Sequence, residues 1–222
     1  MIAFMIIFTP QSLQNDIAKV GIHKLKEACY RTSMLMAPIA GKCLNCFKYY
    51  KMIKQALLGE FQHEAENTRK LLQAIPDSAL DYRPQPHLWS VGQLASHIAE
   101  VYNWFEGTFN SDLFDMGTYK YDKGDISKAA NIVTKFEENF SRAKSVLENS
   151  DESTYMNTWR MQMGGNDIMP PMPKIVVIRG FLYNHLYHHR GEMVAHLRAS
   201  GNQVPGLYGP NYEESQRMMA GQ

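Results

Sequence analysis

The chain has 222 residues, which is enough for one domain of ordinary size with a sizeable core. Its 23 lysines and arginines nearly balance its 22 aspartates and glutamates, so no overall charge directs it toward nucleic acid or an anionic membrane surface. The 8 histidines and 14 methionines are generous numbers, which is consistent with soft metal ligands and adaptable packing.

The first 51 residues differ in charge from the rest of the chain. They carry seven basic and two acidic residues, whereas the remainder has 16 basic and 20 acidic residues. The apolar run over residues 1–9 is about half of the roughly 20 residues that cross a bilayer. It also lacks the basic start of a signal peptide, so we expect no membrane anchor and a cytoplasmic location. We interpret residues 1–51 as a poorly structured extension or an upstream mis-start, residues 52–214 as the folded domain and residues 215–222 as a tail.

All three cysteines lie in that first segment, and Cys43 and Cys46 form a CxxC pair. A structural zinc site would need four ligands, and a redox CxxC would lie on a βαβ pattern, which is absent. We therefore interpret these cysteines as incidental.

Apolar residues at helical spacing predict a first helix over residues 53–75, which Pro76 and Asp77 bring to an end. Glu64 and Thr68 lie on its apolar stripe. They either line a polar site or stand at the edge of the stripe, and the pattern alone leaves both interpretations open.

A second helix is predicted after an extended connection over residues 77–89. Ser90 and Gln93 form a capping box at its start, and its apolar positions continue to about Thr108. His97 occupies one of these apolar positions, where a core helix normally has an aliphatic residue. Alone, it would be a core histidine bonded to a carbonyl or a tyrosine.

Two long connections flank a third helix, predicted over residues 126–147, which carries no histidine and reads as scaffold. The first connection, residues 109–124, is long enough to cross a bundle rather than turn a tight hairpin. The second, residues 149–173, places four methionines near Trp159 and is either an apolar lid over a pocket or a plain linker.

The fourth helix, predicted over residues 174–199, carries the strongest functional signal. At about 100° per residue, His185 and His189 fall on one stripe with apolar residues before and after them. Their i, i+4 spacing places the rings one turn apart, which suits two ligands of one metal ion. A third ligand must then come from another helix.

Three neighbours of these histidines are weaker candidates. His188 lies about 100° from the centre of the stripe, at its edge, so it is a site-lining candidate together with Glu64 and Thr68. His196 returns to the stripe about 10 Å along the axis, and we expect it to lie outside the site. Arg190 is expected to point away from the stripe and to anchor structure rather than substrate.

The remaining segment, residues 201–214, is too rich in proline and glycine for a helix, so we expect an ordered cover over the end of the bundle. We find no strand alternation, Gly-rich phosphate loop, GxSxG elbow or HExxH motif in the sequence. The fold class predicted from these elements is therefore all-α, a four-helix bundle.

Three stretches together resemble the DinB/YfiT-like family of metalloenzymes: WSVGQLASH over residues 89–97, HLYHHRGE over residues 185–192, and VPGLYGP over residues 204–210. The resemblance covers residues 52–214. It implies a bundle with up-down-down-up connectivity and one metal ligand on the second helix with two on the fourth. These correspond to His97, His185 and His189. Glutamine is common in the family where this chain has Glu192, which leaves the ligands intact but changes a neighbouring contact.

Three neutral imidazoles with an open position are typical of a catalytic metal site, because structural zinc is normally closed by four protein ligands. Zinc is the first choice, and nickel, iron or manganese also accept imidazole. By resemblance, the leading hypothesis is an enzyme that transfers a low-molecular-weight thiol, of the bacillithiol or mycothiol type, onto an electrophile. A hydrolase using the same site is a close alternative.

Two other hypotheses come from different classes. The chain can be a stress-associated metal- or ligand-binding module without turnover, or its three histidines can be core residues without metal. No nucleic acid or membrane partner is expected, and a homodimer is plausible because bundles of this type often bury apolar surface by pairing.

Overall fold

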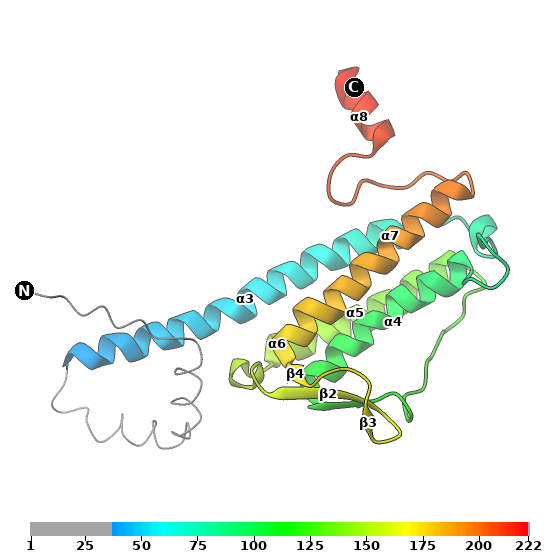
Figure 1. Ribbon diagram of the computed structural model, residues 1–222. Coiled ribbons are helices and arrows are strands. Elements are labelled where there is room, and N and C mark those ends of the chain that lie inside the picture. Colours follow the sequence, from blue (N-terminus) through cyan, green and yellow to red (C-terminus); the bar gives the residue numbers. More distant parts are fainter. Residues whose placement is uncertain (1–36, 222) are drawn as a thin grey trace, which may run out of the picture. The chain divides into compact units, whose positions relative to one another are not determined.

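The computed structural model describes residues 37–221, with side chains from Ile53 onward (Figure 1). The chain divides into two units, Met1–Tyr49 and Tyr50–Gln222, and the fold and site lie in the second. The predictions of an apolar start over residues 1–9 and of an extension or mis-start over residues 1–51 fall mostly on residues 1–36, which lie outside the described residues. Cys43 and Cys46 lie in a helix whose side chains there are also outside that description.

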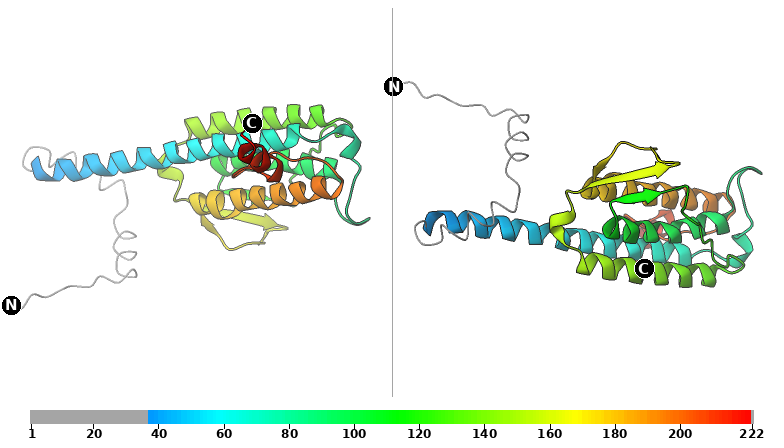
Figure 2. Two further views of the ribbon diagram at one scale, coloured as in Figure 1. Left: turned by 90° about the horizontal axis from the view of Figure 1, so that it is seen from above. Right: turned by 90° about the horizontal axis from the view of Figure 1, so that it is seen from below.

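Most of the described chain is helical, and four long helical segments lie side by side (Figure 2). The segments are α3 (Ala37–Gln73), α4 (Val91–Asn110), α5 (Ala129–Asn149) and a last segment over residues 174–199. The order and the internal boundaries match the four predicted helices to within a few residues. The exception is the start of α3, which begins at Ala37 rather than near Ile53.

Aromatic packing explains why the helices hold together. Phe61 of α3 contacts Tyr102 and Phe105 of α4, with ring centroids 5.5 and 5.2 Å apart, and stacks on Phe140 of α5 at 5.5 Å. Phe136 of α5 packs edge-on against Tyr102, with ring centroids 5.0 Å apart. These rings are buried or half-buried, and they place α3, α4 and α5 around one apolar core.

The last segment is not one regular helix, although the 100° spacing predicted one. It consists of α6 (Lys174–Val177), a π-helical turn η3 (Ile178–Leu182) and α7 (Tyr183–Ala199). The side chain of Asn184, in the first turn of α7, donates a hydrogen bond to the carbonyl oxygen of Gly180 in the π turn at 2.8 Å. Such a turn contains one extra residue, so it rotates α6 relative to α7.

A small sheet corrects the all-α prediction. Strand β1 (Leu113–Asp115) runs parallel to β2 (Thr158–Met163), and β3 (Asn166–Asp167) and β4 (Met172–Pro173) pair antiparallel with β2. The strands belong to the two long connections, and Figure 2 shows them outside the helices. The plain-linker interpretation of residues 149–173 is therefore wrong.

The sheet had a signal in the sequence. In β2, Trp159 and Met161 are buried while Arg160 between them is exposed, which is the period-two alternation of a half-buried strand. Gly164 and Gly165 then turn the chain back into β3 with φ values of 59° and 80°. A Gly-Gly pair between two strands is a hairpin signature, because both turn positions need positive φ.

Short helical elements complete the fold. Turns η1 (Asp77–Ala79) and η2 (Glu152–Thr154) lie in the connections. The helix α8 (Tyr212–Met219) starts within the stretch expected to be non-helical through residue 214. Asn211 and Glu214 form a reciprocal capping box there, and this local signal outweighs the preceding prolines and glycines. Over residues 37–221, none of the helices has the length and apolar character needed to span a bilayer.

Candidate metal centre

Helices α4 and α7 bring three histidine rings together. The ring centroids of His97, His185 and His189 lie 4.4 to 5.1 Å apart. His97 and His189 are 8% and 9% exposed, and His185 is half-buried. One nitrogen from each ring lies within 4.8 Å of the others, so the group can hold a metal ion. Helix α7 supplies two of the candidate ligands, and α4, which is distant in the sequence, supplies the third.

Two glutamates orient these rings from outside the cluster. His97 Nδ1 lies 3.3 Å from Glu100 Oε2, and His189 Nδ1 lies 3.0 Å from Glu192 Oε2. A carboxylate at this position holds the ring proton on Nδ1 and leaves Nε2 with a free lone pair. Glu192, which stands where glutamine is common, therefore provides an acceptor for this neighbouring contact.

The free nitrogens face each other at a spacing that suits an ion. His97 Nε2 and His185 Nε2 are 2.9 Å apart, within hydrogen-bonding distance. Two imidazole nitrogens bound to one tetrahedral zinc at about 2.0–2.1 Å would be about 3.3 Å apart. Small ring rotations that move these nitrogens apart by a few tenths of an ångström would give the spacing that zinc needs. The three histidines therefore fit a divalent ion.

The protonation state of the cluster also suits metal binding. The pKa of His185 is lowered to about 4, mainly by burial and also by the neighbouring His189 and His97. Burial lowers the pKa of His189 as well, although its hydrogen bond with Glu192 opposes that shift. Both rings are therefore neutral near pH 7 and have lone pairs available.

Aromatic side chains form the walls around the histidines. Trp104 stacks on His185 with ring centroids 5.1 Å apart, and Phe181 lies 5.6 Å from the same ring. Trp89 lies 4.9 Å from His97 and 6.0 Å from His189, and it is 45% exposed. The inner walls are apolar, while Trp89 has a large aromatic surface accessible to solvent.

Sequence reasoning missed Glu100 and its supporting partner. Tyr119, in the connection after α4, donates a hydrogen bond to Glu100 Oε1, and Trp104 Nε1 lies 3.3 Å from the same hydroxyl. A partial signal was present, because the spacing HxxE occurs at His97 with Glu100 and at His189 with Glu192, although His63 with Glu66 has it as well. On a helix, residues three apart share a face, so each glutamate can reach its histidine.

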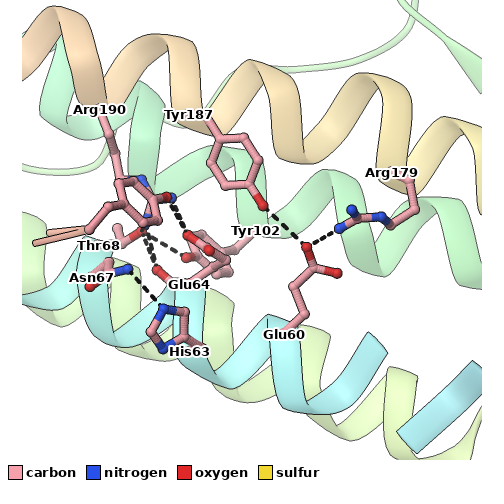
Figure 3. A network of polar contacts seen from close by, with 10 residues as sticks. Glu60, His63, Glu64, Asn67, Thr68, Tyr102, Arg179, Tyr187 and Arg190 are labelled. Carbon is pink, nitrogen blue, oxygen red and sulfur yellow. Dashed lines mark hydrogen bonds and ion pairs between the residues drawn. The ribbon is translucent and has the colours of Figure 1, made fainter. Parts of the chain in front are cut away.

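Glu64 and Thr68 lie in a different buried cluster, on α3 (Figure 3). Arg190 is 1% exposed and donates to Glu64 O at 2.8 Å, to Glu64 Oε2 and to Thr68 Oγ1. Thr68 Oγ1 also lies 2.9 Å from the hydroxyl of Tyr102, and Tyr208 donates to Glu64 Oε2 at 2.6 Å. We call these five residues the Arg190 cluster.

The prediction that Arg190 points away from the histidine stripe and anchors structure is confirmed, because its side chain donates to Glu64 and Thr68 of α3. A single stripe centred on the histidines describes only one of the contacts of α7. His185 and His189 face α4, whereas Arg190, about 100° further round, faces α3. Because α7 packs against both helices, its buried arc is wider than one stripe.

The other two histidines of α7, His188 and His196, lie outside the group formed by His97, His185 and His189. His188 is exposed, next to His189, and belongs to a second group that includes His189 and Glu192. His196 is buried, and its Nε2 lies 4.0 Å from Glu192 Oε1. The groups found among residues 53–221 that could hold an ion do not include His196.

The fold and the site define a helical bundle that can hold a divalent ion between two of its helices. The chain belongs to the DinB family, whose model matches residues 49–221. It is 28% identical over 158 residues to the protein YrdA of Bacillus subtilis strain 168, covering 71% of this chain and 89% of that relative. Membership confirms the predicted resemblance.

Solved structures agree on the fold. A DinB-like protein from Bacillus cereus ATCC 10987 aligns with a TM-score of 0.53 and 22% identity, over 69% of this chain and 97% of that one. The DinB-like protein YjoA from Bacillus subtilis aligns with a TM-score of 0.53 and 14% identity, over 68% and 96%. At these identities the likeness concerns the fold alone, and the up-down-down-up connectivity stays a prediction.

Proposed function

We propose that this DinB family protein is a metal-dependent enzyme whose ion is held by His97, His185 and His189. The observation that carries the proposal is that three imidazole rings converge on one point. In two of them, His97 and His189, the Nδ1 atom on the outer side of the ring contacts a glutamate carboxylate. Zinc is the first choice, because it suits three nitrogen ligands in a tetrahedral arrangement, and nickel, iron and manganese are the alternatives.

The proposed reaction is the transfer of a small thiol onto an electrophile. A divalent ion with an open position can hold such a thiol as its thiolate, the reactive form. The sulfur then bonds to carbon, the leaving group departs with the bonding electrons, and the thiol proton passes to solvent. All three cysteines precede residue 52, so the sulfur would come from the substrate rather than from the folded domain.

The residues around the site have defined parts in this proposal. Glu100 and Glu192 hold the protons on Nδ1 of His97 and His189, which keeps Nε2 of each ring available. Trp104 and Phe181 exclude water on the inner side of His185. The solvent-facing side, beside Trp89, is then where substrates would enter.

The first experiment measures metal content per chain by elemental mass spectrometry. We expect about one divalent ion in the parent protein and near none in a folded His185→Ala, His189→Ala double variant. His188→Ala is the matched control, because its exposed ring is adjacent but outside the triad, and it should retain the ion. A parent protein without metal, even after zinc, nickel and iron are offered, would overturn the proposal.

The second experiment tests turnover. Cysteine and 1-chloro-2,4-dinitrobenzene are mixed with the metal-loaded and the chelator-treated protein, and formation of the thioether is followed by absorbance. Metal-dependent acceleration supports thiol transfer. Metal binding without turnover across a panel of thiols and electrophiles would favour a binding module instead, and loss of the electrophile without thiol consumption would favour hydrolysis.

A homodimer and the thiol and electrophile as partners remain predictions. Light scattering on the purified full chain would give the oligomeric state directly. A monomer at working concentration would remove the dimer from the proposal without affecting the metal site.

A further inference from the structure

Helix α7 carries a second group of metal-ligand residues beside the proposed metal centre. One ligand atom from each of His188, His189 and Glu192 lies within 4.8 Å of the other two, so this group can also hold an ion. His188 and Glu192 are four residues apart on the helix, so they lie on the same face, one turn from each other. Because His188 is exposed, an ion can reach this group from solvent.

His189 cannot be a ligand in both groups at once. A neutral imidazole has one nitrogen with a lone pair and one nitrogen that carries a proton. In His189, Nδ1 lies 3.0 Å from Glu192 Oε2 and carries the proton in that contact. The lone pair is therefore on Nε2, which the proposed metal centre uses. The second group is left with two protein ligands, His188 and Glu192, which we call the outer site.

Glu192 has a carboxylate oxygen available for the outer site. Its Oε2 contacts His189, whereas its Oε1 accepts no hydrogen bond from the residues that the structure describes. The Nε2 atom of His196 lies 4.0 Å from Oε1, which is beyond hydrogen-bonding distance. A carboxylate can bind an ion through one oxygen while the other accepts a hydrogen bond. Glu192 can therefore bind a second ion and keep its contact with His189.

A buried nitrogen next to this free oxygen lacks a partner. His196 is 6% exposed, and its Nε2 has no hydrogen-bond partner among residues 53–221. Buried polar atoms normally have such a partner, either in the protein or in bound water. A divalent ion at Glu192 Oε1 would carry water molecules, and a metal-bound water is a strong hydrogen-bond donor. One of these waters, donating to His196, would satisfy the unpartnered nitrogen.

We propose that α7 binds a second divalent ion at the outer site, between His188 and Glu192 Oε1. Zinc suits this pair of nitrogen and oxygen ligands. With two protein ligands rather than three, the outer ion should bind on the order of a hundredfold more weakly than the ion in the metal centre. It would be lost on gel filtration, so the purified protein would still contain about one ion per chain.

The outer ion would regulate the metal centre through Glu192. A cation at Oε1 draws negative charge from the carboxylate, which weakens the hydrogen bond that holds His189, and the two cations repel each other. Each ion therefore lowers the affinity of the protein for the other, and this coupling is reciprocal. Excess zinc is then expected to inhibit the enzyme. This regulatory meaning rests on the proposed function, whereas binding at the outer site requires only His188 and Glu192.

Equilibrium dialysis against increasing free zinc tests the outer site, with bound zinc counted per chain by elemental mass spectrometry. The untagged, metal-free full chain is used, and its three cysteines are first alkylated with iodoacetamide, because thiolates would also bind zinc. We expect one ion per chain at low free zinc and a second at about a hundredfold higher concentration. His188→Ala should bind the first ion alone. Glu192→Gln should also lose the second ion, since an amide oxygen is a weaker ligand than a carboxylate.

His63→Ala is the matched control. His63 is another exposed histidine on a helix, with Glu66 three residues later, but the groups among residues 53–221 that could hold an ion do not include it. This variant should still bind two ions. A parent protein that saturates at one ion would overturn the inference. So would a second ion that persists in His188→Ala, which would assign that ion to an adventitious site elsewhere.

The two metal proposals can fail separately. In the His185→Ala, His189→Ala variant, loss of the tightly bound ion with retention of the weakly bound one would support both. A parent protein that binds only a weak ion, and loses it in His188→Ala, would remove the metal centre and keep the outer site. A tight ion without a second would keep the metal centre and remove the outer site. If the double variant does not fold, the comparison of the parent with His188→Ala still decides.

Discussion

His189 and Arg190 are consecutive residues of α7, yet they belong to two different polar clusters, the histidine group and the Arg190 cluster. On one side, Arg190 directs its donors at Glu64, Thr68 and Tyr208, so its charge is balanced and its terminal guanidinium nitrogens are bonded within the protein. On the other side, His97 and His185 direct their Nε2 atoms at each other, and a ring nitrogen of His189 lies within 4.8 Å of the other two ligand atoms. A cluster whose donors and acceptors are all bonded to one another stabilises the fold. A cluster of histidines whose ring nitrogens converge on one point is suited to bind a metal ion.

The electrostatics of the two clusters differ in the same way. The Arg190 cluster contains a buried ion pair, which is favourable only while both charges remain together. In the histidine cluster, burial lowers the pKa of His185 and His189, so these rings carry no charge near neutral pH, and the cluster gains a charge when an ion binds.

Replacing Arg190 by alanine should cost the most stability. Glu64 would be left buried and unpaired, so we expect the free energy of unfolding to fall by about 3–5 kcal/mol, measured by urea denaturation of the metal-free protein. Arg142→Ala is the control, because its ion pair with Glu106 is largely exposed and should matter much less. Similar losses in both variants would contradict an anchoring role for the Arg190 cluster.

Removing either carboxylate behind the histidines should weaken metal binding with little effect on the fold. Glu100→Ala and Glu192→Ala should each lower zinc affinity about 10- to 100-fold, measured by competition with a chelator, because the rings lose their orientation. Glu192→Gln should lose less, since an amide oxygen still accepts from Nδ1. Thr68→Val, in the Arg190 cluster, should leave the zinc affinity unchanged. A loss of zinc affinity as large as in the glutamate variants would contradict the separate roles of the two clusters.

The metal-free protein should lose stability as the pH falls from about 6.5 toward 4. The pKa of His185 is lowered to about 4 in the fold, so between these values the unfolded chain takes up a proton that the folded chain does not. The pKa of His189 is lowered in the same direction.

Allowing for partial exposure of the rings, we expect a loss on the order of 1–2 kcal/mol across that window, measured by urea denaturation at several pH values. Bound zinc should suppress the loss near neutral pH, where the rings stay coordinated. A profile that is identical in the His185→Ala, His189→Ala variant would assign the pH dependence to other groups.

The smallest effect is expected from Tyr208→Phe. The hydroxyl of Tyr208 bonds to both Glu64 and Arg190, but the ion pair itself survives its removal. We expect a loss of about 1 kcal/mol in unfolding free energy and no change in metal content. A loss of metal in this variant would show that the two clusters are coupled through α7.

The bundle was predictable because its signals are local and repeated. Apolar spacing marked all four helices, and the Ser90 capping box fixed the start of α4, where the structure has both reciprocal bonds. The candidate ligands were predictable because histidines at apolar positions are costly unless their nitrogens have partners. Convergence on one site required only that two predicted helices pack together.

The features that were missed depend on three-dimensional context. Glu100 looked like one more polar residue on α4, and its part is visible only once Tyr119 folds back from the following connection. The burial of Arg190 depends on α7 packing against α3 as well as α4, which the spacing along one helix does not reveal. The strands were missed because β1 is three residues long and gains its hydrogen bonds from β2, more than forty positions away in the chain.

The π turn has a consequence for how related chains align. Because η3 accommodates one more residue than a regular helical turn, α6 and α7 are out of phase by about 100°. Deleting a single residue there, such as Gly180, would let a regular helix form. It would turn either Lys174, whose Nζ lies 2.8 Å from Asp112 Oδ1, or the histidines away from their partners. A homologous chain without this turn would therefore show a one-residue gap between residues 178 and 182, a length change inside a helix where insertions are seldom tolerated.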